Sequence, residues 1–331
     1  MVREDTEIVA WRCREFGSYS DLNIEHVPIC SPEEGELQIR VRAFTPGFPD
    51  KLMVEGGYQL KPDLPFTPCS EFSGDVVAVG AGVNNSLVGD SVIGSKRFGA
   101  AAELLNVKKE DCIPLPENFD YLKGASFLAA YKTAWVGLVE RGAIRSGEIV
   151  LITGAAGGVG LAAVDLALLK GAKVFALAGG AEKCSFLRER GAHVVLDYLA
   201  EDFRKEVKEL TDGRGVDLVY DAVGGDIFHE TLRCLAPLGR MLLIGFTSGT
   251  IPRFSVNYAL IKQLSIIGVR AGEYGRINPA GGYSVKQELS KIAASGTVCP
   301  HVHRSYRFGE LREAFAEIEQ RTVIGRVVVE V

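Results

Sequence analysis

A glycine-dense turn, residues 154–160, carries the residue types best suited to chemistry in this sequence. It follows the apolar, β-branched run Ile149–Thr153, which is typical of a buried parallel strand, and it precedes a helical pattern. Glycine lets a backbone approach a pyrophosphate closely, and the N–H groups at a helix start attract its negative charge. The turn predicts dinucleotide binding, with a purely structural turn as the alternative, although Ala155 replaces the first glycine of the G-x-G-x-x-G pattern. The expected contacts are Ala156, Gly157, Gly158, Val159 and Gly160.

The elements that must position this turn alternate between strand and helix from about residue 119 onward. Such alternation predicts an α/β fold with a parallel, doubly wound sheet. The expected strands are residues 149–153, 174–178, 194–196, 216–220, 240–246 and 265–269. The expected helices are residues 121–141, 158–170, 182–190, 201–210 and 227–235.

The flanking segments follow a different pattern, and they set the expected domain boundaries. Residues 1–118 are expected to be β-rich, with a Gly- and Pro-rich irregular loop over residues 47–68 that could carry function. The predicted division is residues 1–122, the first part of a β-rich domain; residues 123–262, a nucleotide-binding domain; and residues 263–331, a return to the first domain. Residues 265–269 are alternatively an edge strand of the nucleotide-binding domain.

Composition excludes several classes of protein. The 331 residues are 47% hydrophobic and 24% charged, with a net charge of −5 at pH 7, which is ordinary for a soluble globular protein. An acidic chain has no general attraction to nucleic acid or anionic membranes. The charged start lacks the apolar core of a secretory signal, and seven widely spaced cysteines without a CxxC favour reduced thiols. We therefore expect a cytoplasmic protein without membrane or nucleic-acid partners.

Five stretches, in this domain order, carry a resemblance to a known family: Phe48-Pro-Asp50, residues 65–74, residues 155–160, residues 220–225 and Ile244-Gly-Phe246. With them the chain resembles the medium-chain dehydrogenase/reductase superfamily, and within it the zinc-free, zeta-crystallin-like NADPH:quinone oxidoreductases. The resemblance implies a GroES-like catalytic domain, a Rossmann domain, NADPH as cofactor, and a homodimer of the kind often built through Rossmann sheet edges.

The resemblance also allows the metal ligands of zinc-dependent relatives to be compared. Their Cys, His and Cys positions fall on Gly47, Ser70 and the region of Ala129, and only Glu71 beside them remains a ligand type. Zinc needs about three or four converging N, S or O ligands. We therefore predict no metal. Without a Lewis acid to stabilise an alkoxide, alcohol oxidation is disfavoured, whereas an electrophilic quinone or enone remains reducible.

The cofactor preference depends on the end of the strand at residues 174–178. NAD-binding folds usually place an acidic residue there for the ribose 2′-OH, but this strand leads into Gly179. By resemblance, Lys183 and Tyr198 contact the NADP 2′-phosphate. The alternatives are a solvated helix lysine and a locally packed loop aromatic, and Glu182 could oppose a phosphate. NADPH is favoured over NADH.

The reacting end of the cofactor is placed by resemblance alone. Thr133, Val223, Gly224, Phe246 and Val269 would surround the nicotinamide, with an ordinary βα turn at residues 223–225 as the alternative.

The candidate catalytic residues are Tyr58 and Asp50, which by resemblance belong to the substrate cleft. The Tyr58 ring could stack on a quinone or could simply anchor its loop, and Asp50 could equally hold that loop. Relatives usually carry asparagine at the place of Gly47, so a polar group is lost here. Cys69 is expected to be a small buried residue. No general acid is evident, which suits quinone reduction better than ketone reduction.

The predicted function is zinc-independent, NADPH-dependent hydride transfer to a quinone or related conjugated carbonyl, a small electrophile. One alternative is reduction of the C=C bond of an enone, enal or 2-enoyl thioester. An alternative of another class is an NADPH-binding structural or RNA-binding zeta-crystallin-like protein with little catalysis.

Overall fold

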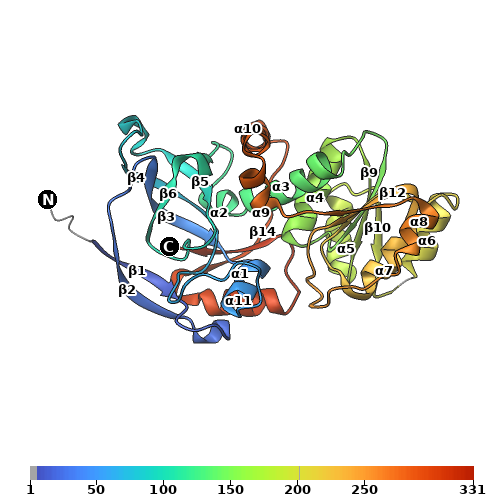
Figure 1. The fold of residues 1–331 in the computed structure, drawn as a ribbon, viewed down its shortest axis with the longest axis horizontal. Coiled ribbons are helices and arrows are strands. Elements are labelled where there is room, and N and C mark those ends of the chain that lie inside the picture. The colour runs from blue at the N-terminus through green and yellow to red at the C-terminus, as the bar shows by residue number, and fades with distance from the viewer. Residues whose placement is uncertain (1–5, 201) are drawn as a thin grey trace. The chain divides into compact units, whose positions relative to one another are not determined.

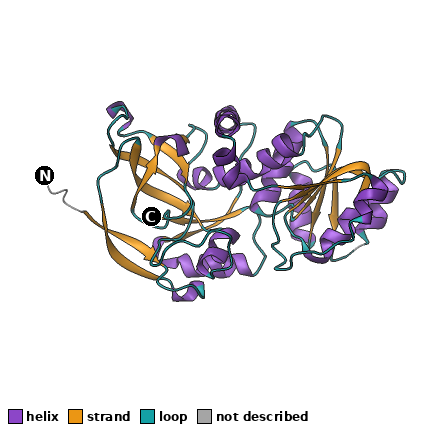
Figure 2. Ribbon diagram, in the orientation of Figure 1, coloured by secondary structure: helices purple, strands orange, loops and turns teal. Residues whose placement is uncertain are grey.

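The computed structural model describes residues 6–200 and 202–331 and divides into two compact units (Figures 1 and 2). Unit 1 runs to Ala129 and resumes as Ser290–Val331, and unit 2 is Ala130–Leu289. Unit 1 is built mainly on antiparallel strands, whereas unit 2 is a parallel sheet with helices between its strands. The predicted α/β class, with a β-rich part and a doubly wound part, is confirmed.

The sheet of unit 1 has seven strands in the order β14-β15-β3-β4-β5-β7, with β6 paired to β3. Residues Leu37, Ile39 and Val41 of β3 are buried at alternate positions, as expected for a strand with one face on a core. The strands of this sheet are β3 (Glu36–Thr45), β4 (Glu71–Val79), β5 (Ser91–Ser95), β6 (Leu104–Lys108), β7 (Cys112–Pro114), β14 (Val302–Arg307) and β15 (Arg326–Glu330). A separate antiparallel pair is β1 (Thr6–Arg12) with β2 (Asn23–Ile29).

Helix α1 (Phe48–Val54) lies in the segment that was expected to be irregular, so that expectation was wrong for the first part of the segment, whereas residues 55–68 form no helix or regular strand. Gly47 is its N-cap, and proline stands in its first turn, where the missing N–H costs no hydrogen bond. Asp50 accepts a hydrogen bond of 2.8 Å from the Gly47 N–H. The glycine and proline therefore begin a short helix rather than a loop.

Unit 2 contains a six-stranded parallel sheet in the order β10-β9-β8-β11-β12-β13 (Figure 1). Its central strands are buried apolar runs, which is typical of a parallel sheet covered on both faces. The strands are β8 (Ile149–Thr153), β9 (Lys173–Ala178), β10 (Val194–Asp197), β11 (Val216–Asp221), β12 (Leu235–Leu243) and β13 (Ser265–Gly268). The helices that follow them are α4 (Gly158–Leu169), α5 (Ala181–Glu189), α6 (Phe203–Leu210), α7 (Gly225–Cys234) and α8 (Asn257–Lys262). Glu201, expected to begin a helix, lies outside the described residues.

The second domain boundary differs from the expected one at residues 262 and 263. Strand β13 pairs in parallel with β12, so it is an edge strand of the sheet of unit 2. Helix α9 (Ala271–Ile277) also belongs to unit 2, where Tyr274 donates a hydrogen bond of 2.8 Å to Glu140. The chain returns to unit 1 only within α10 (Pro279–Ser295), because the strand pairing keeps the preceding segment on the parallel sheet.

The expected helix over residues 121–141 is three consecutive pieces. They are α2 (Tyr121–Ala125), α3 (Leu128–Trp135) and a wider π-helical turn, Val136–Arg141. The Ser126 hydroxyl donates to the carbonyl of Leu122 at 2.9 Å, a local bond that competes with helix continuation at the end of α2.

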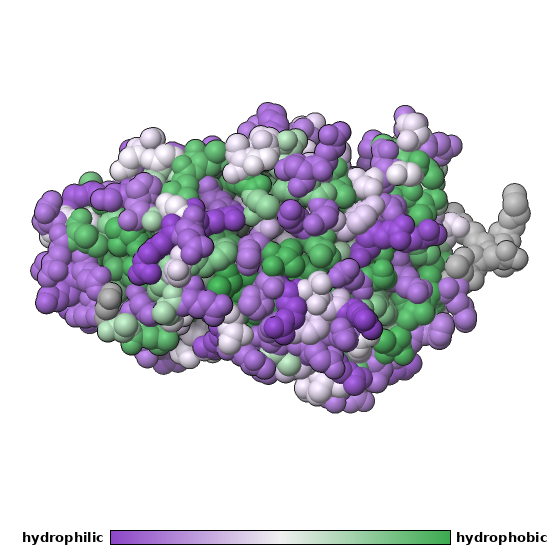
Figure 3. Space-filling view, turned by 180° about the vertical axis from the view of Figure 1, so that it is seen from behind, coloured by the Kyte–Doolittle hydropathy of each residue, from purple (hydrophilic) through white to green (hydrophobic). Residues whose placement is uncertain are grey.

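Within the described residues no helix is long and apolar enough to span a bilayer. On the face drawn in Figure 3, apolar patches lie between hydrophilic side chains.

Candidate functional site

The glycine-dense turn joins β8 to α4 in a conformation that requires glycine at two positions. Gly154 has a φ of 59°, and a Cβ at Gly160 would lie 2.1 Å from the carbonyl oxygen of Gly154. Gly157 is the N-cap of α4, and no side chain of the described residues caps this helix start. The first N–H groups of α4 are therefore available to an anion. The predicted contacts in this turn and the first helical turn are Ala156, Gly157, Gly158, Val159 and Gly160.

Asp221, at the end of β11, holds a second turn against the first. Its Oδ1 accepts hydrogen bonds of 2.7 Å from the Thr153 hydroxyl, 3.0 Å from the Val223 N–H and 3.1 Å from the Gly224 N–H. Burial raises the pKa of this carboxyl. A Cβ at Gly224 would lie 2.8 Å from Cδ1 of Phe246. The structure thus brings Gly224, next to Val223 in the chain, against Phe246; that these residues surround the nicotinamide stays a prediction.

The predicted 2′-phosphate residues gather where β9 leads into α5. A Cβ at Gly179 would lie 2.7 Å from both Cζ and Oη of Tyr198, so the tyrosine ring lies against this glycine. Lys183 is in the first turn of α5. Burial lowers its pKa, and the neighbouring Glu182 acts in the opposite direction. Gly179 and Tyr198 therefore lie against each other next to the first turn of α5, which carries Lys183.

Thr133 and Val269, the other two residues predicted to surround the nicotinamide, lie on other elements of unit 2. Thr133 lies on α3. Val269 follows β13, and its N–H donates to the Leu243 carbonyl at 3.0 Å. Their assignment to the nicotinamide remains a prediction.

A buried network that the sequence analysis missed joins three helical segments of unit 2. Tyr131 on α3 donates a hydrogen bond of 2.5 Å to Asp165 on α4. Arg190, which follows α5, donates two hydrogen bonds of 2.7 Å to the same carboxylate. The network fixes the segment that carries Thr133 against the helix that begins at the glycine turn. The one signal for it in the sequence was Asp165 itself, a charged residue inside an apolar helix.

Two buried carboxylates and one guanidinium form the polar cluster of unit 1. Asp50 is 4% exposed and Glu71 is fully buried. Arg326 Nη2 donates to Glu71 Oε2 at 3.0 Å, and the Ala129 N–H donates to Glu71 Oε1 at 2.7 Å. The cluster therefore joins β15, β4 and the segment after α2 in the neighbourhood of α1. Asp50 holds the start of α1 through the Gly47 N–H, which agrees with the alternative that Asp50 holds its loop.

Both carboxyl groups of this cluster have raised pKa values. Burial raises the pKa of Asp50 to about 6 and that of Glu71 to about 7, while the Arg326 charge opposes both shifts. Two carboxyl groups beside one cation can thus hold a proton close to neutral pH.

Tyr58 and Cys69 lie in the same unit. The Tyr58 N–H donates to the Leu52 carbonyl at 3.1 Å, and its half-buried ring packs against the core. Cys69 is fully buried with a φ of 65°, and burial raises the pKa of its thiol well above the usual range. A protonated buried thiol is a poor nucleophile.

Among residues 6–200 and 202–331, no three His, Cys, Asp or Glu side chains converge as a metal ion requires. Gly47 and Ser70 bring no strong ligand to the position of Glu71, whose carboxylate is committed to Arg326 and backbone N–H groups.

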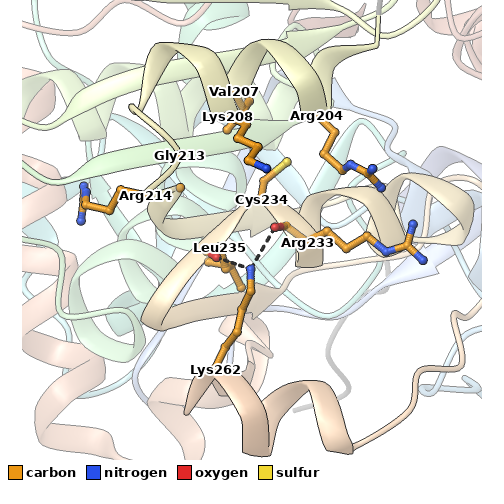
Figure 4. Close-up of a pocket in the computed structure, with 10 residues that line it drawn as sticks. Arg204, Val207, Lys208, Gly213, Arg214, Arg233, Cys234, Leu235 and Lys262 are labelled. Carbon is orange, nitrogen blue, oxygen red and sulfur yellow. Dashed lines mark hydrogen bonds between the residues drawn. The ribbon is translucent and has the colours of Figure 1, made fainter.

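A cavity of about 320 Å³ lies elsewhere in unit 2, where β11 and β12 begin (Figure 4). Several of its basic side chains already have partners. Arg204 and Arg233 pair with Glu230 at 3.0 and 2.9 Å. Lys262 donates to the carbonyls of residues 233 and 235 at 3.0 and 2.7 Å, which caps the end of α7 (Figure 4). Because the predicted cofactor turns follow the other ends of these strands, this cavity is separate from them.

Comparisons with known proteins agree with both units. A family model described as an alcohol dehydrogenase GroES-like domain matches residues 33–117, and one described as zinc-binding dehydrogenase matches residues 158–287. The chain is 37% identical over 300 residues to the quinone oxidoreductase-like protein 2 homolog of Nematostella vectensis, covering 89% of this chain and 82% of that protein.

Solved structures give the same result. The native structure of mycobacterial Rv1454c complexed with NADPH is similar with a TM-score of 0.90 and 30% identity, over 98% of this chain and 100% of that one. The CurK enoyl reductase is similar with a TM-score of 0.89 and 27% identity, over 98% of this chain and 99% of that one.

Proposed function

Because the chain belongs to the medium-chain dehydrogenase/reductase superfamily, among its quinone oxidoreductase-like members, we propose that it transfers a hydride from NADPH to a quinone or a related conjugated carbonyl. When bound, NADPH supplies the hydride with its two electrons. Unit 2 binds this cofactor, and unit 1 binds the acceptor. The observation that carries the proposal is the turn at Gly154 and Gly160, whose bare backbone leads into an uncapped helix start.

The residues of unit 2 fit this cofactor along its length. The glycine turn and the N–H groups of α4 would hold the pyrophosphate, and Gly179, Lys183 and Tyr198 would hold the 2′-phosphate. Val223, Gly224 and Phe246, with Thr133 and Val269, would enclose the nicotinamide. The NADPH complex of the mycobacterial neighbour supports the choice of cofactor.

We propose that the reaction needs no zinc. Gly47 and Ser70 supply no ligand, and Glu71 is held by Arg326. The acceptor must then be electrophilic by itself, since no Lewis acid polarises it. Tyr58 and Asp50 remain the candidate residues of the acceptor site, Tyr58 through its ring and Asp50 by holding the start of α1.

A second candidate function is reduction of the C=C bond of an enone, enal or 2-enoyl thioester. The structural similarity to the CurK enoyl reductase favours it. The two reactions share the cofactor and differ in the atom that accepts the hydride.

The test is NADPH oxidation against para- and ortho-quinones, an enal, an enone and a 2-enoyl thioester, with NADH in parallel. Turnover on quinones with NADPH supports the proposal. Turnover restricted to the alkenes favours the second function. NADPH binding without turnover on any acceptor favours a structural or RNA-binding role, and metal-dependent alcohol oxidation contradicts zinc independence.

We also propose a homodimer formed through the sheet edge of unit 2. Strand β13 ends the sheet order, and Ile251, Val256, Leu260 and Ile261 are 71–78% exposed in the segment that leads to it. Exposed apolar groups beside an edge strand favour association. Light scattering should show a dimer that Leu260→Glu weakens and Leu199→Glu, at an exposed leucine near β10, leaves intact; a wild-type monomer contradicts the dimer.

We further propose a cytoplasmic protein without membrane or nucleic-acid partners; the acidic net charge of −5 supports the part of this proposal that concerns nucleic acids and anionic membranes.

A further inference from the structure

The cavity drawn in Figure 4 is lined by positively charged side chains. Its volume of about 320 Å³ lies at the lower end of the range of about 300–1,000 Å³ that is typical of small-molecule sites. None of the described residues that line it carries a carboxylate, although the whole chain has a net charge of −5. Its cations are Arg204 and Lys208 of α6, Arg214, Arg233 of α7 and Lys262 of α8.

Two carboxylates beside the cavity pair with its three arginines. Glu230 accepts hydrogen bonds from Arg204 at 3.0 Å and from Arg233 at 2.9 Å, so two guanidinium groups share one carboxylate. Asp217 accepts two hydrogen bonds from Arg214, at 2.6 and 2.9 Å, and Arg214 points away from the other cations (Figure 4). The charges of the arginines are therefore only partly compensated.

The two lysines of the cavity lack a carboxylate partner. Among the described residues, neither Lys208 nor Lys262 forms an ion pair. Lys262 gives two of its three N–H donors to the carbonyls of residues 233 and 235, so one donor remains. Burial lowers the pKa of Lys262, and only Cys234 and Tyr258 act in the opposite direction. Lys262 is thus a half-buried cation whose counter-ion is missing.

Basic side chains at helix ends also have a purely structural explanation. Lys208 lies in the last turn of α6 and Arg233 in the last turn of α7, where a cation balances the partial negative charge of the free carbonyls. The same dipole disfavours Arg204, which lies in the first turn of α6. The cations of three helices therefore gather around the cavity rather than around helix ends alone.

We propose that this cavity binds a small anion with one or two phosphate groups, held by Lys208 and Lys262, with Arg204 and Arg233 at its edge. A phosphate group has several charged acceptor oxygens, so it can use donors from several side chains at once. An acidic chain does not attract a long polyanion over its surface, so a small free anion suits one isolated cationic cavity. The predicted cofactor turns follow the opposite ends of these strands, so this site goes beyond the proposed function.

The experiment measures binding of inorganic pyrophosphate and inorganic phosphate to the full chain by isothermal titration calorimetry at constant ionic strength. Saturating NADP⁺ keeps these anions out of the glycine turn. Lys208→Met and Lys262→Met should each weaken pyrophosphate binding by about tenfold or more, as expected for loss of a hydrogen bond to a charged group. The affinity for NADPH should stay within about twofold of the wild type in both variants.

Lys205→Met is the matched control, because this lysine lies on the same helix with a 73% exposed side chain and does not line the cavity. It should bind pyrophosphate as the wild type does. Gly157→Ala, in the glycine turn, should also leave this binding unchanged. A protein that binds pyrophosphate through Lys208 and Lys262 but does not bind NADP⁺ would therefore contradict the proposed function and still support the phosphate site.

Thermal unfolding separates the phosphate site from helix-end stabilisation. Pyrophosphate should raise the Tm of the wild type and of Lys205→Met but not that of Lys262→Met, because only a bound ligand stabilises the folded state. Lys208 is exposed, so Lys208→Met keeps the site testable if Lys262→Met does not fold. Wild-type protein that binds neither anion, or lysine variants that bind pyrophosphate equally well, overturns the assignment. Binding of an oligoribonucleotide through these lysines in place of pyrophosphate also overturns it.

Discussion

Arg190 donates two hydrogen bonds of 2.7 Å to the carboxylate of Asp165, and the side chains of Arg190 and Asp165 are 22% and 7% exposed. Tyr131 bonds the same carboxylate from a third element. Because the aspartate is almost fully buried, its charge depends on these partners rather than on water. The fold around the glycine turn is thus fixed by an ion pair between α4 and the end of α5.

Asp165→Ala should lower the free energy of unfolding by about 2–4 kcal/mol, since it removes the buried carboxylate that accepts two hydrogen bonds from Arg190 and one from Tyr131. Urea unfolding measures this loss. Lys205→Ala is the control, because its pair with Glu209 is 3.9 Å long with both side chains more than 60% exposed; it should cost less than about 0.5 kcal/mol. Equal losses in the two variants would show that burial does not decide the strength of the pair.

Two substitutions in the glycine turn should have different effects. A Cβ at Gly160 would lie 2.1 Å from the carbonyl oxygen of Gly154, so Gly160→Ala should destabilise the fold and weaken cofactor binding together. At Gly157 the nearest atom would lie at 3.4 Å, an ordinary contact. Gly157→Ala should therefore leave the free energy of unfolding unchanged. It should weaken NADPH binding, because the added methyl group would crowd the pyrophosphate that the glycine backbone approaches closely. Unchanged affinity in folded Gly157→Ala would favour the purely structural turn.

Local patterns predicted the parts of the fold that local interactions determine. The apolar run Ile149–Thr153 is β8, and the glycine spacing located the helix start at Gly158. Helix α1 was missed because Gly47 and Pro49 favour turns as well as helix starts. The same two residues are therefore consistent with a turn and with the start of a helix.

The polar networks could not be predicted, because their members are far apart in the chain. Tyr131 and Asp165 are 34 residues apart, and Glu71 and Arg326 are 255 apart. No periodicity of the sequence connects such positions. Only the strand order of the sheet places β15 and β4 on either side of β3.

Lys183→Ala should weaken NADPH binding by about 1–3 kcal/mol and leave NADH binding nearly unchanged, because the lysine would bond only the 2′-phosphate. Fluorescence titration with both nucleotides measures the difference. Lys208→Ala, an exposed lysine on α6, is the control for loss of one positive charge. Equal weakening of both nucleotides by Lys183→Ala would remove this residue from the 2′-phosphate site.

Asp50 and Glu71 should make the protein less stable as the pH rises. Burial raises the pKa of Asp50 from 3.8 to about 6 and that of Glu71 from 4.5 to about 7, so the folded state holds protons that the unfolded state releases. Their contribution is fully present below pH 4 and is lost as the pH rises through about 6 and 7.

The loss should reach at most about 3–4 kcal/mol for each group, from about 1.4 kcal/mol for each pKa unit. Urea unfolding between pH 5 and 8 should therefore show a falling free energy in the wild type and a flatter profile in Asp50→Asn and Glu71→Gln. Only the slope is compared, because both variants also change the absolute stability. Asp63→Asn, at an exposed carboxyl, should keep the wild-type slope. A wild-type stability that rises over this range, unchanged in both variants, would mean that these carboxyls are ionised in the folded chain already at pH 5.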